Sequence, residues 1–254
     1  MRHVLLVVLF LLVPFLKSGL AAPTLLFDQG HGQTFTIEKA GELQLGQLAT
    51  QLRADGWQVA STASALTPEA LAGLDALVIS GPFKPFTAKE LAAIDTFLQD
   101  GGRLAVMLHV AQPAASLLNQ LGVVHANGVV REGDQRLVIN DDPFSFRVSH
   151  LQPHPLTNGL TSFALYGAWP LLPEGANSRS IADTSLGAWV DLDGNNVFSQ
   201  GDAMQELSVL VVGQVGKGEW AVFGDDAMFQ NKFLQGENIK LAANLSRWLR
   251  SAVD

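Results

Sequence analysis

The most regular pattern of apolar and polar positions lies in the middle of the chain, over residues 75–110. Two apolar runs, residues 76–80 and 103–108, each have glycine at one end, as is typical of strands buried on both faces of a parallel sheet. Between them, apolar side chains recur at helical spacing, at Leu91, Ile94 and Leu98. This stretch predicts two parallel strands joined by a helix in a right-handed crossover.

The predicted helix has signals at both of its ends. Thr87 is placed to cap the first turn, and Glu90, three residues later, completes a capping box. Gly101 follows the last apolar position and supplies the left-handed conformation that often ends a helix. The helix is therefore expected between Thr87 and Gly101.

The alternation of strands and helices extends over residues 24–121. Short strands are predicted at residues 24–27 and 57–60, and a short helix is predicted to begin at Thr67. Two further helices have apolar faces, formed by Leu45, Leu48, Ala49 and Leu52 and by Leu117, Leu118 and Leu121. Four strands that alternate with helices predict an α/β fold with a doubly wound, mostly parallel sheet.

Helical spacing disappears over residues 122–212, where short β-like pieces alternate with glycine, proline, asparagine and aspartate. A turn over residues 213–218 then leads into a predicted strand at 219–223. The last helix has one apolar face, formed by Leu241, Leu245, Trp248 and Leu249. We predict a single α/β domain over residues 22–254, with a β-rich extension at about 122–212.

The first 21 residues have the pattern of an export signal: a basic start, an apolar run over residues 4–13, and small residues at Gly19 and Ala21. Cleavage is predicted after Ala21. The alternative is an uncleaved anchor, but the apolar run is shorter than the roughly 20 residues that a spanning helix needs. The signal predicts a periplasmic or secreted protein with no membrane span after cleavage.

Composition excludes several kinds of function. The chain has no cysteine, which rules out disulfides, thiolate metal sites and a cysteine nucleophile. Its net charge of −8 leaves no basic stripe for nucleic acid. The chain also lacks the G-x-S-x-G, Walker A and H-E-x-x-H motifs, so the common serine-hydrolase, nucleotide-hydrolase and zinc-protease classes lose support.

Titratable side chains follow several of the predicted strands. Ligands of open α/β sheets bind beyond the carboxyl ends of the strands, so these side chains are candidates for one common site. The catalytic candidates are Asp28, His31, His109, Asp225 and Asp226. The ligand-binding candidates are Gly30, His31, Gly32, Ser80 and Gly81.

Two of these candidates have a structural alternative. The glycines of Gly30-His31-Gly32 either present backbone N–H groups to an anion near a helix start or form a tight turn in which His31 is exposed or caps a helix. His109 either acts as a general base or simply ends its strand as a hydrogen-bonded histidine.

Residues 191–202 match a calcium-binding loop. Oxygen ligands are expected at alternate positions, from Asp191, Asp193, Asn195, the carbonyl of Val197, and Asp202. The loop departs from the pattern because Asn196 replaces the usual glycine at position six and the closing acid is aspartate. The alternative is a solvated Asp-Gly turn in a hairpin. Calcium is the one cofactor that the sequence predicts.

Residues 78–110, VISGPFKPFTAKELAAIDTFLQDGGRLAVMLHV, resemble the class I glutamine amidotransferase-like, flavodoxin-like domain of auxiliary proteins in ABC-type and gliding-motility transport systems and of intraflagellar transport proteins. FDQGHGQ at residues 27–33 and FGDDAMFQNKFL at 223–234 resemble the two ends of an uncharacterised family in that group. The resemblance implies a flavodoxin-like fold without amidotransferase chemistry. The cysteine expected after the fourth strand is missing, with His109 near that point, so glutamine hydrolysis through a thioester is excluded.

We therefore predict an exported, non-catalytic amidotransferase-like protein that binds a small ligand or a cell-envelope partner, as an auxiliary component of a transport system. The alternative is a metal-assisted or His/Asp-dependent envelope hydrolase that uses Asp28, His31 and Asp225 or Asp226. A third interpretation is a structural subunit of a transport assembly, which predicts an exposed apolar patch.

Overall fold

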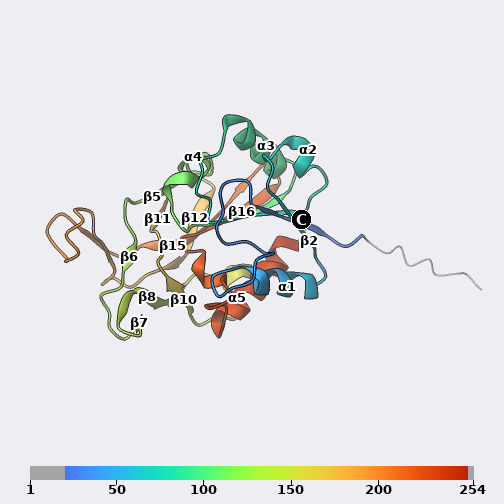
Figure 1. Cartoon of the computed structure of the whole chain (residues 1–254). Coiled ribbons are helices and arrows are strands. Elements are labelled where there is room, and N and C mark those ends of the chain that lie inside the picture. Colours follow the sequence, from blue (N-terminus) through green and yellow to red (C-terminus); the bar gives the residue numbers. More distant parts are fainter. Residues whose placement is uncertain (1–20, 251–254) are drawn as a thin grey trace, which may run out of the picture.

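A ten-stranded mixed sheet runs through the centre of the molecule (Figure 1). The computed structural model describes residues 21–250. Five strands at one side of the sheet are parallel, in the order β2-β1-β3-β4-β16. They are β1 (Thr24–Asp28), β2 (Gln58–Thr62), β3 (Ala76–Ser80), β4 (Arg103–Met107) and β16 (Gly218–Phe223).

The other side of the sheet is antiparallel. It consists of β15 (Ser208–Val215), β11 (Leu171–Pro173), β5 (Val123–His125), β12 (Ser178–Asp183) and β9 (His150–Leu151). The sheet is therefore mixed rather than mostly parallel. The reason is that residues 122–212 add strands to the central sheet, which the loss of helical spacing could not reveal.

Two small antiparallel sheets complete the β structure. One contains β10 (Phe163–Tyr166), β8 (Asp142–Val148) and β7 (Val138–Ile139). The other contains β14 (Ala203–Met204), β13 (Trp189–Val190) and β6 (Val130–Arg131). Short 3-10 helices lie at Gln112–Ala114, Pro155–Thr157 and Ala227–Phe229.

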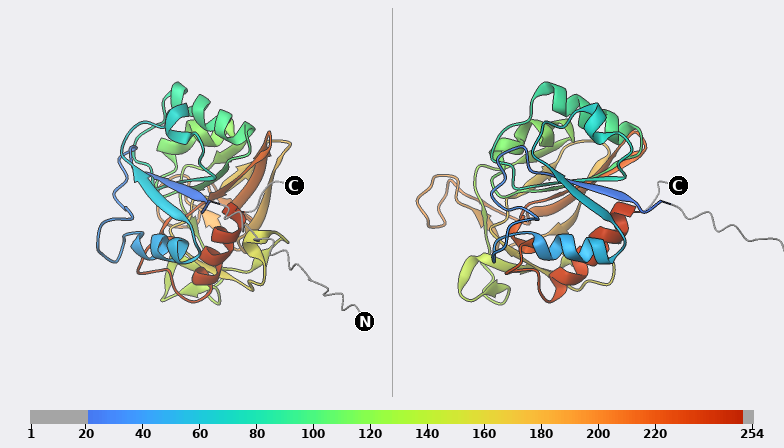
Figure 2. Two further views of the ribbon diagram at one scale, coloured as in Figure 1. Left: turned by 90° about the vertical axis from the view of Figure 1, so that its right-hand side faces the viewer. Right: turned by 45° about the vertical axis from the view of Figure 1, so that its right-hand side comes forward.

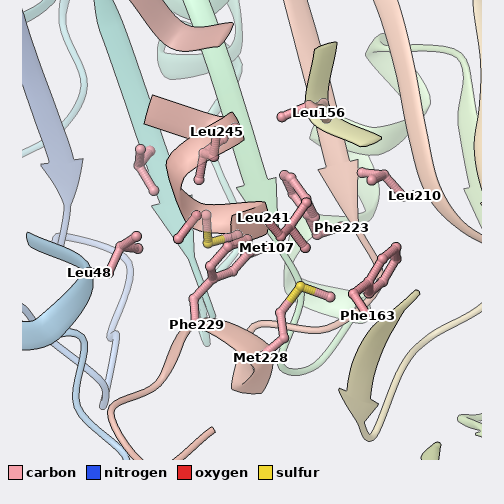
Figure 3. Close-up of a cluster of buried hydrophobic side chains, with 14 of the residues drawn as sticks. Leu48, Met107, Leu156, Phe163, Leu210, Phe223, Met228, Phe229, Leu241 and Leu245 are labelled. Carbon is pink, nitrogen blue, oxygen red and sulfur yellow. The ribbon is translucent and has the colours of Figure 1, made fainter. Parts of the chain in front are cut away.

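Helices cover both faces of the central sheet (Figure 2). On one face lie α1 (Gly46–Ala54) and α5 (Glu237–Arg250), and on the other lie α2 (Pro68–Leu71), α3 (Ala88–Gln99) and α4 (Ala115–Gln120). Figure 3 shows how the first face packs: Leu241 and Leu245 of α5 meet Met107 and Phe223 of the sheet, and all four are fully buried. Burying each such side chain contributes roughly 1.5–3 kcal/mol.

The central strand–helix–strand unit is confirmed. The crossover joins parallel strands β3 and β4, and Thr87 and Glu90 form the predicted capping box at the start of α3. Gly101 has a φ of 108°, a conformation that glycine adopts readily just after the helix. The apolar faces predicted for α1 and α5 are also buried as expected.

The predicted signal segment lies almost wholly outside the described residues. Within residues 21–250, no helix is both long enough and apolar enough to cross a membrane.

Candidate functional site

The carboxyl ends of four parallel strands meet at one edge of the sheet. Ser80 is paired in register with Met107, and Met107 with Phe223, so the residues that follow these strands lie side by side. Asp28, at the end of β1, belongs to the same edge. The structure divides the predicted catalytic residues into two groups: His31 pairs with Asp28, and His109 pairs with Asp226.

The first group is a buried histidine between two carboxylates. His31 Nδ1 lies 2.8 Å from Asp28 Oδ2, and His31 Nε2 lies 3.2 Å from Glu90 Oε1. Gln33 Nε2 also donates to Asp28 Oδ2, at 2.6 Å. Only 5% of His31 is exposed. Both ring nitrogens therefore face protein carboxylates, and neither is open to a substrate.

Charge explains how His31 is held. Burial disfavours the imidazolium, but the hydrogen bond and charge of Asp28, together with Glu90, raise the pKa of His31 above its ordinary value. The charged ring then donates from both nitrogens. His31 fastens the loop after β1 to the first turn of α3, which is a structural role. The expectation that His31 is exposed or caps a helix is wrong, because Asp28 and Glu90 enclose it.

In the glycine segment around His31, two backbone N–H groups already have acceptors within the protein. Gly30 N already donates to Asp28 Oδ1 at 3.0 Å, and His31 N donates to Gln33 Oε1 at 2.8 Å. Helix α1 begins only at Gly46, and the start of α3, which does lie beside His31, is already capped by Thr87 and Glu90. Gly32 has a φ of 74° and packs against the Lys84 side chain, so its glycine suits a tight turn.

The second group consists of His109, whose ring is partly exposed, and Asp226, a buried carboxylate that holds the ring. His109 Nδ1 lies 3.0 Å from Asp226 Oδ1, and the side chain of His109 is 37% exposed while that of Asp226 is fully buried. The Trp169 indole donates to the backbone carbonyl of His109 at 3.0 Å. Both the ring and the backbone of His109 are thus held in place, and Nε2 is the ring nitrogen left for other contacts.

Two phenylalanines flank the His109 ring. The Phe35 ring centroid lies 4.8 Å from that of His109 in an edge arrangement, and the Phe83 centroid lies at 5.5 Å. Phe83 is 40% exposed, and Phe35 is half-buried. We call Phe35, Phe83 and His109 the aromatic cluster. It combines apolar surface with one polar ring at the carboxyl edge.

Two adjacent carboxyls lie beneath the cluster. Burial raises the pKa of Asp225 to about 7, the charge of Asp226 adds to this shift, and N–H donors from Tyr166 and Ala227 oppose it. Burial also raises the pKa of Asp226, against the opposing effect of His109. The hydrogen bond from Asp226, reinforced by its charge, raises the pKa of His109. Asp226 therefore shifts the protonation balance of His109 toward the imidazolium form.

Ser80 and Gly81 adjoin the second group. Ser80 is 3% exposed, so its hydroxyl cannot serve as a surface nucleophile. Within the described part of the chain, Ser80 Oγ and Asp226 Oδ2 are buried without a hydrogen-bond partner. Gly81 packs directly against Asp226, where a larger side chain would clash. This close contact explains the glycine without the predicted ligand contact.

Sequence reasoning missed three residues of these groups. The sequence predicts Glu90 only as part of the capping box, whereas in the structure its Oε1 atom also faces His31. Phe35 and Phe83 lie in loops, where apolar residues have no periodicity to mark them. The one sequence feature that could have indicated them is that each phenylalanine lies in a loop that follows a strand at the carboxyl edge.

The predicted calcium loop connects β13 and β14 as a hairpin. One carboxylate oxygen from each of Asp191, Asp193 and Asp202 lies within 4.8 Å of the others. Asn196 has a φ of 65°, so it adopts the left-handed conformation that glycine commonly supplies at this position. Asn195 Oδ1 accepts from Val197 N, and Arg131 Nη2 lies 3.2 Å from Asp191 Oδ2. The donor set suits a hard cation, although an arginine already pairs with one of the acids.

Comparison with known proteins identifies related folds. A family model described as the IFT52 GIFT domain matches residues 24–119. The mmIFT52 N-terminal domain is 21% identical, with a TM-score of 0.71 over 90% of this chain and 98% of that chain. A ThuA-like protein from Bacteroides uniformis is 16% identical, with a TM-score of 0.56 over 91% and 93% of the two chains. A cytoplasmic protein, STM1381 from Salmonella typhimurium LT2, is 16% identical, with a TM-score of 0.54 over 90% and 100%. No curated protein sequence matches the chain.

These comparisons correct the predicted localisation. The sequence predicts a periplasmic or secreted protein. The family model and the solved structure with a TM-score of 0.71 both belong to IFT52, an intraflagellar transport component that is neither periplasmic nor secreted. The prediction is therefore wrong. It depended on the export-signal pattern of residues 1–21, in which a basic start precedes an apolar run and small residues.

The expected resemblance is shown at the level of the fold. ThuA-like proteins have a glutamine amidotransferase-like fold, and the mixed α/β architecture found here is similar to theirs and to that of the IFT52 N-terminal domain. The chain thus has a glutamine amidotransferase-like fold.

Proposed function

We propose that this protein is a non-catalytic, amidotransferase-like binding module whose ligand or protein partner docks over the aromatic cluster. The observation that supports this proposal is the position of His109. The ring is fixed by a buried carboxylate and flanked by two phenylalanines, yet it remains 37% exposed. A rigid polar group set in apolar surface binds without paying a large ordering entropy.

The surroundings of His109 favour binding over covalent catalysis. The chain contains no cysteine, and the nearby Ser80 hydroxyl is buried. Asp28 and His31, which a hydrolase would have used, are committed to each other and to Glu90. The likeness to IFT52, an intraflagellar transport component, is consistent with a role as an auxiliary component of a transport assembly.

We also infer that the parallel half of the sheet is flavodoxin-like and doubly wound. Its order, β2-β1-β3-β4-β16, corresponds to the 2-1-3-4-5 order of that fold, and helices cover both faces. In such sheets the ligand site lies at the carboxyl edge where the strand order reverses, between β1 and β3. Phe83 and Phe35 follow these two strands, which agrees with docking at this edge.

A mixed set of small probes tests the binding role. Neutral, cationic and anionic aromatic compounds are each added to the ¹⁵N-histidine-labelled protein, and the imidazole signals of His109 are followed by NMR. The proposal predicts that at least one chemical class shifts His109 saturably while His150, an exposed histidine paired with Glu206, does not respond. If no class shifts His109 at millimolar concentration, the proposed binding role is wrong.

A His/Asp-dependent hydrolase is the second candidate. What favours it is that Asp226 holds His109 Nδ1 at 3.0 Å, an arrangement that leaves Nε2 available to move a proton. The residues involved would be His109 and Asp226 instead of Asp28 and His31. Turnover that depends on His109 separates this candidate from the binding module.

We further propose that the loop at residues 191–202 binds calcium in a structural role. Support comes from the three clustered aspartates and from the left-handed Asn196. Calcium would tie the β13–β14 hairpin together and would have to compete with Arg131 for Asp191.

A further inference from the structure

The aromatic cluster has a defined chemical preference that extends the binding role proposed above and rests on it. The neutral ring of His109 would donate from one nitrogen only, whereas the charged ring donates from both. Asp226 Oδ1 lies 3.0 Å from His109 Nδ1, so that nitrogen already has a hydrogen-bond partner. While Asp226 is ionised and accepts from Nδ1–H, the second donor, Nε2–H, is present only in the imidazolium form. An occupant that accepts a hydrogen bond at Nε2 therefore selects the charged ring.

The groups that face His109 come from the segments packed around it. Asp226 and Asp225 follow β16, Phe83 follows β3, and Phe35 lies in the loop after β1. The two carboxyls raise the pKa of His109, and neither phenylalanine carries charge. The exposed side of the ring is thus bordered by apolar surface. An ionic hydrogen bond made beside apolar groups is stronger than one made in open water.

We propose that the cluster recognises a carboxylate with an aromatic or apolar group beside it, such as a small aromatic acid or an acidic, aromatic-containing segment of a partner. The carboxylate accepts from His109 Nε2, and the apolar group covers Phe83, which is 40% exposed. The Phe35 ring, whose centroid lies 4.8 Å from that of His109, adds apolar surface to the same patch.

Preorganisation supports this assignment. The Trp169 indole holds the His109 backbone at 3.0 Å, and Asp226 holds the ring, so neither needs to be ordered on binding. The backbone of Gly81 packs so closely against Asp226 that no side chain fits between them. This contact limits the movement of the carboxylate. A fixed donor is the arrangement expected of a recognition site.

The test compares N-acetylphenylalanine with N-acetylphenylalanine amide and with acetate, using NMR titration of the His109 imidazole. N-acetylphenylalanine should bind and raise the pKa of His109 by about 0.5 or more, since it prefers the charged ring. The neutral amide and acetate should each bind roughly tenfold more weakly, because each lacks one half of the recognised group. A short peptide that ends in phenylalanine separates a partner segment from a free acid by its tighter binding.

Variants locate the site. Phe83→Ala should weaken N-acetylphenylalanine binding by roughly fivefold to tenfold, whereas Phe198→Ala, which truncates another exposed phenylalanine, should leave it unchanged. The inference is overturned if the amide binds as well as the acid, if binding lowers the His109 pKa, or if Phe83→Ala has no effect. If only a neutral or cationic probe shifts His109, the ligand class is wrong but the binding role stands. If no probe shifts His109, both fail.

Discussion

Gly81 lies so close to Asp226 that a Cβ atom at position 81 would stand 2.6 Å from Asp226 Oδ2. The same atom would lie 3.2 Å from Cβ of His109. The backbone of Gly81 also has a φ of 54°, which side chains rarely adopt. A single glycine therefore maintains the contact between the end of β3 and the pair formed by His109 and Asp226.

Alanine at Gly81 and at a control glycine should distinguish the effect of packing on stability from that of backbone strain. Gly81→Ala is expected to lower the free energy of unfolding by roughly 2–4 kcal/mol, because it combines overpacking with an unfavourable φ. Gly73→Ala is the matched control, since Gly73 has a φ of 73° but would place its Cβ atom in open space. Its expected loss is about 1 kcal/mol. Equal losses in urea denaturation would show that the contact with Asp226 is unimportant.

Asp225 should make the protein lose stability as the pH rises. Its pKa is about 7 in the folded protein, against an ordinary value of 3.8, so the folded state favours the protonated acid. This stabilisation is complete below about pH 4 and is lost as the pH rises through 7. Between pH 5 and 8 the loss should be on the order of 1–4 kcal/mol.

The variant Asp225→Asn isolates this effect, because asparagine does not ionise. Thermal melts across the same pH range should show a smaller loss for Asp225→Asn than for the unaltered protein. His31 and His109 also have raised pKa values and lose stabilisation in the same direction, so some pH dependence should persist. Identical pH profiles for the two proteins would contradict the assignment to Asp225.

His31 should be essential for stability. His31→Gln removes the positive charge between Asp28 and Glu90, and is expected to destabilise the fold by roughly 3–5 kcal/mol because two buried carboxylates lose their partner. The control is His150→Gln, which breaks an exposed pair with Glu206 and should change stability by less than about 1 kcal/mol. Similar urea midpoints for the two variants would remove the structural role given to His31.

Calcium should stabilise the protein through the loop at residues 191–202. Excess calcium is expected to raise Tm by a few degrees relative to chelator, by mass action. The shift should disappear in Asp193→Ala, which removes a ligand oxygen, and persist in Asp134→Ala, which alters an acid outside the loop that pairs with Arg136. A shift that survives in Asp193→Ala, or no shift in the unaltered protein, would argue against the site.

The local units of the fold could be predicted because their signals lie close together in the chain. The capping box of Thr87 and Glu90 and the apolar spacing of α3 are contained within 12 residues, and both are confirmed. The pairing of β5, β11 and β12 with β15 depends on contacts between distant short strands. Short strands carry little periodicity of their own, so the mixed character of the sheet was missed.

The candidate site was predictable in its members but not in its pairings. Asp28, His31, His109 and Asp226 were all identified, since each follows a strand at the same edge. Whether His31 would pair with Asp226 or with Glu90 depended on the path of the loop after β1. That loop turns His31 inward against α3, and local sequence does not specify this direction.

The central claim is that His109 serves binding and not turnover. The most direct measurement compares ammonia release from glutamine and nitrophenol release from nitrophenyl acetate by the unaltered protein, His109→Ala and His150→Ala. We expect rates no higher than the buffer background and equal for all three proteins. Turnover by the unaltered protein and His150→Ala that falls by roughly 100-fold or more in His109→Ala would contradict the account and establish a histidine-dependent hydrolase.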